Sequence, residues 1–171
     1  MVYIMDFKVD GGCRGNGQSG AIGAAAVILL SKWGDKYNYK TKVLDRYPTP
    51  TNQRAEILAI IMALKWALER YDELDTYPFL QVEIRSDSKY AVNCMNQWIY
   101  KWSQNGWTNS AGNEVANSDL IREASRLDDR VAALGKVSYV WIPREENEEA
   151  DSLCNKAMDE ISDDEWSSSS W

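Results

Sequence analysis

The first third of the chain alternates short apolar runs with turn residues. Residues 3–9 alternate like a half-buried strand, and the glycine-rich stretch 11–20 follows as a tight turn. Residues 21–30 are largely apolar, which predicts a second, buried strand, and residues 37–44 alternate again before Pro48 breaks the pattern. Three short strands separated by turns predict an antiparallel meander.

The rest of the chain mixes helices with two further strands. Between residues 55 and 68 the only charged side chains are Glu56 and Lys65, and Pro and Gly are absent, so we expect a mostly buried helix that begins near Thr51–Asn52. The same reasoning predicts strands over 80–84 and 136–142, one or two short helices within 89–108, and helices over 119–134 and 148–158.

The order of these elements is βββαβαβα. We therefore predict an α/β (α+β mixed) fold with a five-stranded mixed sheet and helices on both faces. At 171 residues, with 44% hydrophobic and 26% charged side chains, the chain fits one soluble globular domain. We assign residues 1–158 to a catalytic domain and expect the acidic, Ser-rich residues 159–171 to form a disordered tail.

The net charge of −7 argues at first against nucleic acid as a partner, because phosphates are bound by Lys and Arg. However, residues 145–171 hold ten Asp or Glu and one Lys, a net charge of −9, which leaves residues 1–144 at about +2. The acidity belongs to the C-terminal end, and the body of the chain is compatible with a nucleic-acid partner.

Cysteine and histidine content narrows the chemistry further. The three cysteines, Cys13, Cys94 and Cys154, have no spacing typical of a disulfide framework or a zinc site. The chain has no His, which excludes Ser-His-Asp, Cys-His and His-ligated metal chemistry. Without an apolar signal segment or membrane span, we expect an intracellular protein, cytoplasmic or nuclear. Hydrolysis by this chain must depend on carboxylates.

Four carboxylates occupy predicted element ends or first helical turns. Asp10 ends the first strand, Glu56 lies in the first turn of the buried helix, Asp87 follows the fourth strand, and Asp151 lies in the first turn of the last helix. Helix capping alone would explain each of them singly. Glu56 is the exception, because a carboxylate on an apolar helix is costly to desolvate without a cation.

Four converging carboxylates would repel one another, and divalent cations relieve that repulsion. Ligand sets made only of oxygen suit Mg²⁺ or Mn²⁺ and not zinc. Two such ions about 4 Å apart can activate a water and stabilise the leaving oxygen of a phosphodiester.

Four motifs in register resemble the type 1 ribonuclease H family. They are DGGCRGNG at 10–17, TNQRAEI at 51–57, SDSKY at 86–90 and NEEADSL at 147–153. The resemblance extends over about residues 3–158. It implies the ribonuclease H-like fold and an endonuclease that hydrolyses the RNA strand of RNA–DNA hybrids, leaving 5′-phosphate and 3′-hydroxyl ends. It also implies that Asp10, Glu56, Asp87 and Asp151 bind two Mg²⁺ ions per site, with Mn²⁺ as a substitute, and that no small-molecule cofactor is used.

Substrate-binding residues follow from the same resemblance. Groove contacts are expected from Gly11, Cys13, Asn16, Asn52 and Gln53, although turn chemistry alone could explain these residues; reading 2′-hydroxyls is how such a groove tells RNA from DNA. Residues 98–114 are similar to the family's substrate-handling protrusion. There the DNA strand would be held by Trp98, Trp102 and Ser110, and its phosphate by Thr51 and Asn117. An ordinary apolar helix face is the alternative explanation for the tryptophans.

Two departures from the family pattern stand out. Thr49 occupies a position where many relatives have Arg, and the protrusion has few Lys, which predicts weak, salt-sensitive hybrid binding. The His-containing loop that many relatives have before the last Asp is missing from PREENEEAD at 143–151, which indicates a shorter variant of the family. Glu145 or Glu146 could move the proton instead, or could be ordinary solvated charges.

Two competing functions remain open. A silent hybrid- or RNA-binding module could keep the fold, although it would not need all four carboxylates. A resolvase- or integrase-like nuclease acting on DNA would share the carboxylates but should lack the TNQRAE and Trp-rich patterns. We expect a monomer whose partner is an RNA–DNA hybrid and which does not bind membranes.

Overall fold

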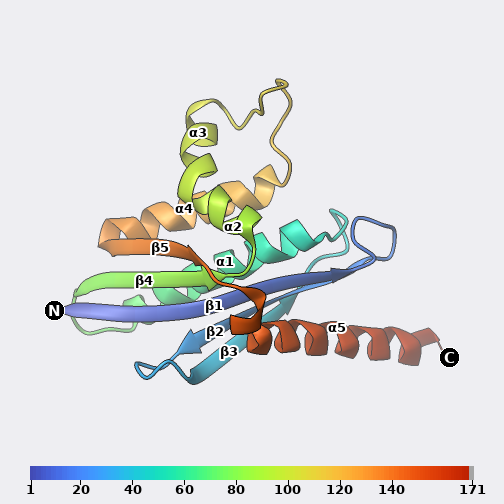
Figure 1. Ribbon diagram of the computed structural model, residues 1–171, viewed down its shortest axis with the longest axis horizontal. Coiled ribbons are helices and arrows are strands. Elements are labelled where there is room, and N and C mark those ends of the chain that lie inside the picture. Colours follow the sequence, from blue (N-terminus) through green and yellow to red (C-terminus); the bar gives the residue numbers. More distant parts are fainter. Residues whose placement is uncertain (170–171) are drawn as a thin grey trace.

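Five strands form one mixed sheet in the computed structural model, which describes residues 1–169, without the side chains of Tyr37 and residues 162–169. The strands are β1 Val2–Arg14, β2 Ile22–Leu30, β3 Lys36–Val43, β4 Phe79–Ser86 and β5 Gly135–Trp141. Their order across the sheet is β3-β2-β1-β4-β5 (Figure 1). β1 pairs antiparallel with β2 and parallel with β4, β2 pairs antiparallel with β3, and β4 pairs parallel with β5. The predicted meander and mixed sheet are confirmed.

Helices cover both faces of the sheet, as predicted. α1 (Asn52–Asp72) packs on the face formed by Met5, Phe7 and Val9 of β1, and α4 (Ser118–Leu134) packs against α1. α5 (Glu148–Ser169) lies on the opposite face (Figure 1). There its apolar side chains meet the alternate residues of β2 in a second, smaller core made of Ala24, Ala26, Cys154, Ala157 and Met158. Two separate cores therefore hold the sheet between its helices.

The segment after β4 is helical almost without interruption. α2 (Lys89–Asn93) continues into a π-helical turn (Cys94–Trp98) and then into α3 (Ile99–Gln104). α3 and the loop after it rise away from the sheet (Figure 1). A short 3₁₀ turn (Arg144–Glu146) precedes α5. No described helix is both long and apolar enough to cross a bilayer.

The predicted end of the first strand is wrong. β1 does not end near Val9 but continues to Arg14, because its pairing with β2 persists through Arg14 and Ile22. Asp10 therefore lies inside a strand, and the tight turn is confined to the residues after Arg14, where Gly15, Gly17 and Gly20 take positive φ.

The last helix is also longer than predicted. It does not stop at Met158 but runs to Ser169, so residues 159–169 are helical where we expected a disordered tail. An ion pair between Arg14 and Asp159 (2.8 Å) fixes the helix to β1 just beyond the apolar pattern. Residues 170–171, the end of that tail, lie outside the described residues.

Candidate active site

Asp10 is the buried centre of the candidate site. Its side chain is only 7% exposed, and it projects from the part of β1 that pairs with Ala26 of β2. The buried thiol of Cys154 on α5 donates a hydrogen bond to the Asp10 carbonyl oxygen (3.3 Å). The parallel strands β1 and β4 point the same way, so Asp10 and the residue after β4 lie near the same edge of the sheet.

Glu56 reaches this edge because α1 begins very close to β1. A Cβ atom on Gly11 would lie 2.3 Å from the carbonyl carbon of Ala55 and from the amide nitrogen of Glu56, so only glycine allows this approach. Thr51 caps the helix, since its Oγ1 accepts a hydrogen bond from the Arg54 amide (3.1 Å). The Ser88 hydroxyl then donates to Glu56 Oε2 (2.6 Å), which links α1 to the turn after β4.

Asp87 lies in that turn, directly after the last residue of β4. The Ser86 carbonyl oxygen accepts the Ile142 amide (2.9 Å), and the Asp87 carbonyl oxygen accepts the indole N–H of Trp141 (3.1 Å). The end of β5 therefore fixes the carbonyl groups on both sides of the Asp87 Cα atom.

Asp151 is the most exposed of the four carboxylates and lies in the first turn of α5. Its amide donates to the carbonyl oxygen of Asn147 (3.1 Å), and the Asn147 side chain donates to the carbonyl oxygen of Val9 (2.8 Å), next to Asp10. The Oδ1 of Asn147 is buried and has no hydrogen-bond partner among the described residues. Asn147 thus joins the start of α5 to the strand that carries Asp10.

The pKa values show that these carboxylates act on one another. Burial first, and then the charges of Asp87, Asp151 and Glu56, raise the pKa of Asp10 from 3.8 to about 8. Burial also raises the pKa of Glu56, against the opposing effects of the Ser88 hydrogen bond and the Arg144 guanidinium. The fold therefore brings together the four carboxylates singled out in the sequence, at a cost in electrostatic repulsion.

An ionic ligand for this site would have to be a cation that prefers oxygen. All four side chains are carboxylates, which fits Mg²⁺ or Mn²⁺, and their mutual repulsion is what such an ion would relieve. Within the described part of the chain, no three Asp, Glu or Cys side chains are already arranged as a set of metal ligands. The donor chemistry thus fits a divalent cation, and side-chain movement would have to complete the coordination.

The expected groove residues gather around the start of α1. Asn16, in the glycine-rich turn, accepts the Asn52 amide through Oδ1 (2.8 Å), which ties the hairpin to the helix. The Asn117 side-chain amide donates to Gln53 Oε1 (3.3 Å) and to the Tyr90 hydroxyl (3.1 Å). Asn117 has a φ of 63°, so its backbone is in the left-handed region. Together with the cap residue Thr51, these polar groups form one surface beside Glu56.

The remaining expected contacts are arranged less tightly. The rings of Trp98 and Trp102 lie 5.5 Å apart, and both pack in part against the main core, so the apolar-face explanation accounts for some of their surface. Ser110 lies in the exposed loop between α3 and α4, and Cys13 is half-buried near the end of β1.

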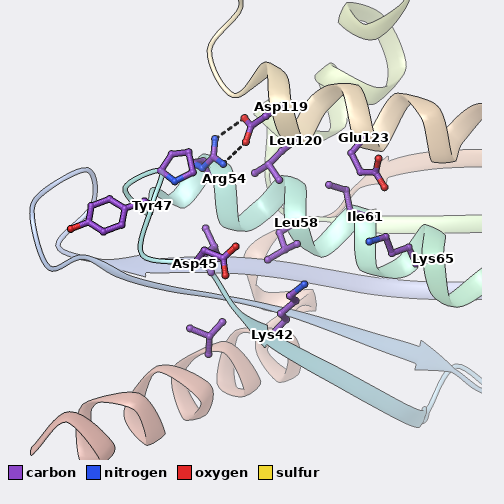
Figure 2. Close-up of a pocket in the computed structure, with 13 residues that line it drawn as sticks. Lys42, Asp45, Tyr47, Arg54, Leu58, Ile61, Lys65, Asp119, Leu120 and Glu123 are labelled. Atoms are coloured by element: carbon purple, nitrogen blue, oxygen red, sulfur yellow. Dashed lines mark hydrogen bonds and ion pairs between the residues drawn. The ribbon is translucent and has the colours of Figure 1, made fainter.

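A cavity of about 250 Å³ lies elsewhere, between β3, the 44–48 loop, α1 and α4 (Figure 2). None of the four carboxylates lines it. At one end, the buried Arg54 guanidinium makes two hydrogen bonds with the Asp119 carboxylate (2.9 and 2.7 Å) and approaches Asn117 Oδ1 (3.5 Å). Arg54 therefore braces the loop that carries Asn117 from the side away from the carboxylates.

Several residues around the carboxylates were missed in the sequence. The sequence indicated that residues 86–88 end a strand and start a helix, and Ser88 does cap α2, but its hydrogen bond to Glu56 and the contact of Asn147 with β1 were not predicted. Arg144 had a visible signal, because it is the only Lys or Arg between Lys136 and Lys156. Trp141 gave no local signal, since its contact joins residues 54 positions apart.

Comparisons with known proteins identify the family and the fold. The family model described as RNase H matches residues 4–159. A ribonuclease H from Francisella tularensis subsp. novicida (strain U112) is 35% identical over 156 residues, covering 89% of each chain, and one from Francisella philomiragia subsp. philomiragia matches equally well. The crystal structure of RNase H1 from the halophilic archaeon Halobacterium salinarum NRC-1 is 26% identical with a TM-score of 0.61, covering 92% of this chain and 99% of its own. LC11-RNase H1, crystallised in complex with an RNA/DNA hybrid, shares the fold at a TM-score of 0.68 and 24% identity, covering 92% of this chain and 98% of its own.

Proposed function

The chain belongs to the RNase H family of nucleases, and on that premise we propose that it hydrolyses the RNA strand of RNA–DNA hybrids by two-metal-ion catalysis at Asp10, Glu56, Asp87 and Asp151. The observation that carries the proposal is the convergence of the four carboxylates at one edge of the sheet, where burial and the charges of Asp87, Asp151 and Glu56 raise the pKa of Asp10. Carboxylates that repel one another in this way are typical of functional sites, and the function that fits four carboxylates is the binding of divalent cations. The hybrid-bound structural relative supports the choice of substrate.

In this proposal the carboxylates hold two Mg²⁺ ions, with Mn²⁺ as a substitute. When bound, the ions would activate the attacking water and stabilise the leaving 3′ oxygen, which gives 5′-phosphate and 3′-hydroxyl ends. Ser88 orients the Glu56 carboxylate, and Asn147 positions Asp151 relative to Asp10. The surface formed by Asn16, Thr51, Asn52, Gln53 and Asn117 would receive the minor groove of the hybrid. The catalytic unit would be residues 1–158, acting as a monomer.

The missing histidine leaves room for another charged group. The sequence suggested Glu145 or Glu146 for proton transfer. Arg144 cannot transfer a proton, because a guanidinium stays protonated, but its charge acts on the Glu56 carboxyl group and lowers its pKa. We propose that Arg144 provides positive charge next to the scissile phosphate, whereas Glu145 and Glu146 remain solvated charges.

The test is cleavage of an end-labelled RNA–DNA hybrid in Mg²⁺, in Mn²⁺ and in chelator, with duplex RNA and duplex DNA as controls. We expect metal-dependent cutting of the RNA strand only, with product 5′ ends that resist kinase labelling until they are dephosphorylated. Asp10→Asn should still bind the hybrid but not cut it. Binding without cutting by the unaltered protein would instead identify a silent binding module, and cutting of duplex DNA would identify a different nuclease.

A further inference from the structure

Trp141 contacts the main chain of a proposed metal-binding residue. β4 ends at Ser86, so the next carbonyl group, that of Asp87, has no partner in the β4–β5 ladder. The indole N–H of Trp141 donates to this carbonyl oxygen at 3.1 Å. The Trp141 side chain thus adds one hydrogen bond beyond the end of the β4–β5 ladder, at Asp87 itself.

Lys89 lies over the same ring. Its ammonium nitrogen is 5.1 Å from the centre of the Trp141 ring, within the range of a cation–π interaction. Lys89 is exposed and forms no ion pair within the described part of the chain, and the ring beneath it is 44% exposed. A cation free of carboxylate partners is therefore held two residues from Asp87, at an edge rich in negative charge.

We propose that Trp141 and Lys89 form a contact for the strand that is cut, in which Trp141 positions Asp87 and holds the Lys89 ammonium for a phosphate of the RNA. The scissile strand must lie at the carboxylates, and the ring that holds Lys89 is hydrogen-bonded to Asp87, so we assign the Lys89 contact to that strand and not to the DNA strand. This inference rests on the proposed function of the four carboxylates. It adds a phosphate-binding role for Lys89, which lies inside the SDSKY motif, and a positioning role for Trp141, which lies outside all four motifs.

A second lysine–tryptophan pair provides a matched control. Lys32 lies 4.9 Å above the ring of Trp33 at the tip of the β2–β3 hairpin, and Trp33 is 79% exposed. The two pairs share their chemistry and their charge. Only the Trp141 pair is hydrogen-bonded to the main chain of a catalytic carboxylate. If any exposed lysine–tryptophan pair helped binding equally, both pairs would respond alike.

The Lys89 arm of the test measures hybrid binding in chelator, where the strand stays uncut. Lys89→Gln should weaken binding about fivefold at low salt and reduce the slope of log affinity against log salt by about one, because one phosphate contact is lost. Lys32→Gln removes the same charge and should leave both the affinity and the slope within twofold. Equal effects of the two substitutions would overturn the proposed phosphate contact.

The Trp141 arm measures the metal site. Trp141→Phe keeps a ring but loses the N–H donor, so kcat should fall about tenfold, and Mg²⁺ binding measured by calorimetry should weaken. Trp33→Phe should change neither. If Trp141→Phe lost only thermal stability and kept wild-type kcat and Mg²⁺ binding, its role would be structural and the proposal wrong. Failure of the proposed function itself would be seen separately, as an unaltered protein that does not cut.

Discussion

Replacing Asp10 by Asn should abolish cleavage and at the same time stabilise the protein in the absence of metal. The carboxyl group is nearly inaccessible to water and its charge is opposed by Asp87, Asp151 and Glu56. An amide of almost the same shape removes that charge. The same residue would then be the most important for catalysis and among the least favourable for folding.

The size of the effect follows from the pKa. Asp10 has a pKa of about 8 in the fold against an ordinary value of 3.8. At pH 7, about three pH units above the ordinary value, folding must take up a proton at a cost of about 1.4 kcal/mol per unit, or about 4 kcal/mol. Part of this cost remains in the variant, because the new amide is buried too, so we expect Asp10→Asn to raise the free energy of unfolding by about 2–4 kcal/mol.

The dependence on pH gives the sharper test. Because the folded-state pKa is the higher one, the folded protein binds more protons than the unfolded chain between pH 3.8 and about 8. The contribution of Asp10 to stability is therefore fully present below pH 3.8 and is lost as the pH rises through that window.

Urea unfolding in chelator, at about pH 5 and about pH 8, should accordingly show a larger gain for Asp10→Asn at the higher pH. Asp75→Asn, an exposed carboxylate in the loop before β4, is the control for net charge. Mg²⁺ should stabilise the wild type more than the variant. A gain independent of pH, or a destabilised variant, would refute the electrostatic account.

Three further predictions concern the groups that support the site, all measured by urea unfolding. Gly11→Ala should destabilise by at least about 2 kcal/mol and reduce cleavage, because its Cβ would overlap the α1 backbone, whereas Gly12→Ala should cost less, since its Cβ meets only a flexible methionine end at 3.3 Å. Thr51→Ala should cost about 1 kcal/mol by removing the cap of α1, and Thr51→Ser should restore it. Asp119→Ala should cost about 3 kcal/mol and Arg54→Met less, because Arg54 is the buried partner of this ion pair and would be left uncompensated; equal losses would contradict that view.

Local pattern was enough to predict the elements of the fold but not all their ends. Alternation identified β1 and β3, and the apolar run identified α1. The error at Gly11–Gly12 arose because glycine is used in two ways, for turns and for close approach. Here it allows α1 to contact the strand, which depends on a helix more than 40 residues away. The error beyond Met158 arose because an acidic, Ser-rich sequence lacks the apolar periodicity that marks a packed helix.

The candidate site divides in a similar way. The carboxylates could be found from the sequence because each stands at a helix start or near a predicted strand end, although Asp10 lies inside β1 in the structure. Their supporting contacts could not, because they depend on register. Trp141 meets Asp87 only because β5 pairs with β4 at Ser86, and Asn147 meets Val9 only because the 3₁₀ turn returns the chain to β1. Neither pairing is encoded by neighbouring residues.

The supporting contacts share one property that bears on catalysis. Those of Cys154, Trp141 and Asn147 are all made to main-chain carbonyl oxygens, at Asp10, Asp87 and Val9. These hydrogen bonds fix the main chain from which the carboxylate side chains project, and they do not occupy the carboxylate oxygens. Two of the carboxylates also accept a side-chain hydrogen bond directly: the Ser88 hydroxyl donates to Glu56 Oε2 (2.6 Å), and the Asn155 side-chain amide donates to Asp151 Oδ2 (3.4 Å). A site held in this way leaves most of its carboxylate oxygens available, which an arrangement of ion pairs among the same residues could not do. The repulsion that makes Asp10 costly for folding is therefore the same property that would draw divalent cations to this edge of the sheet.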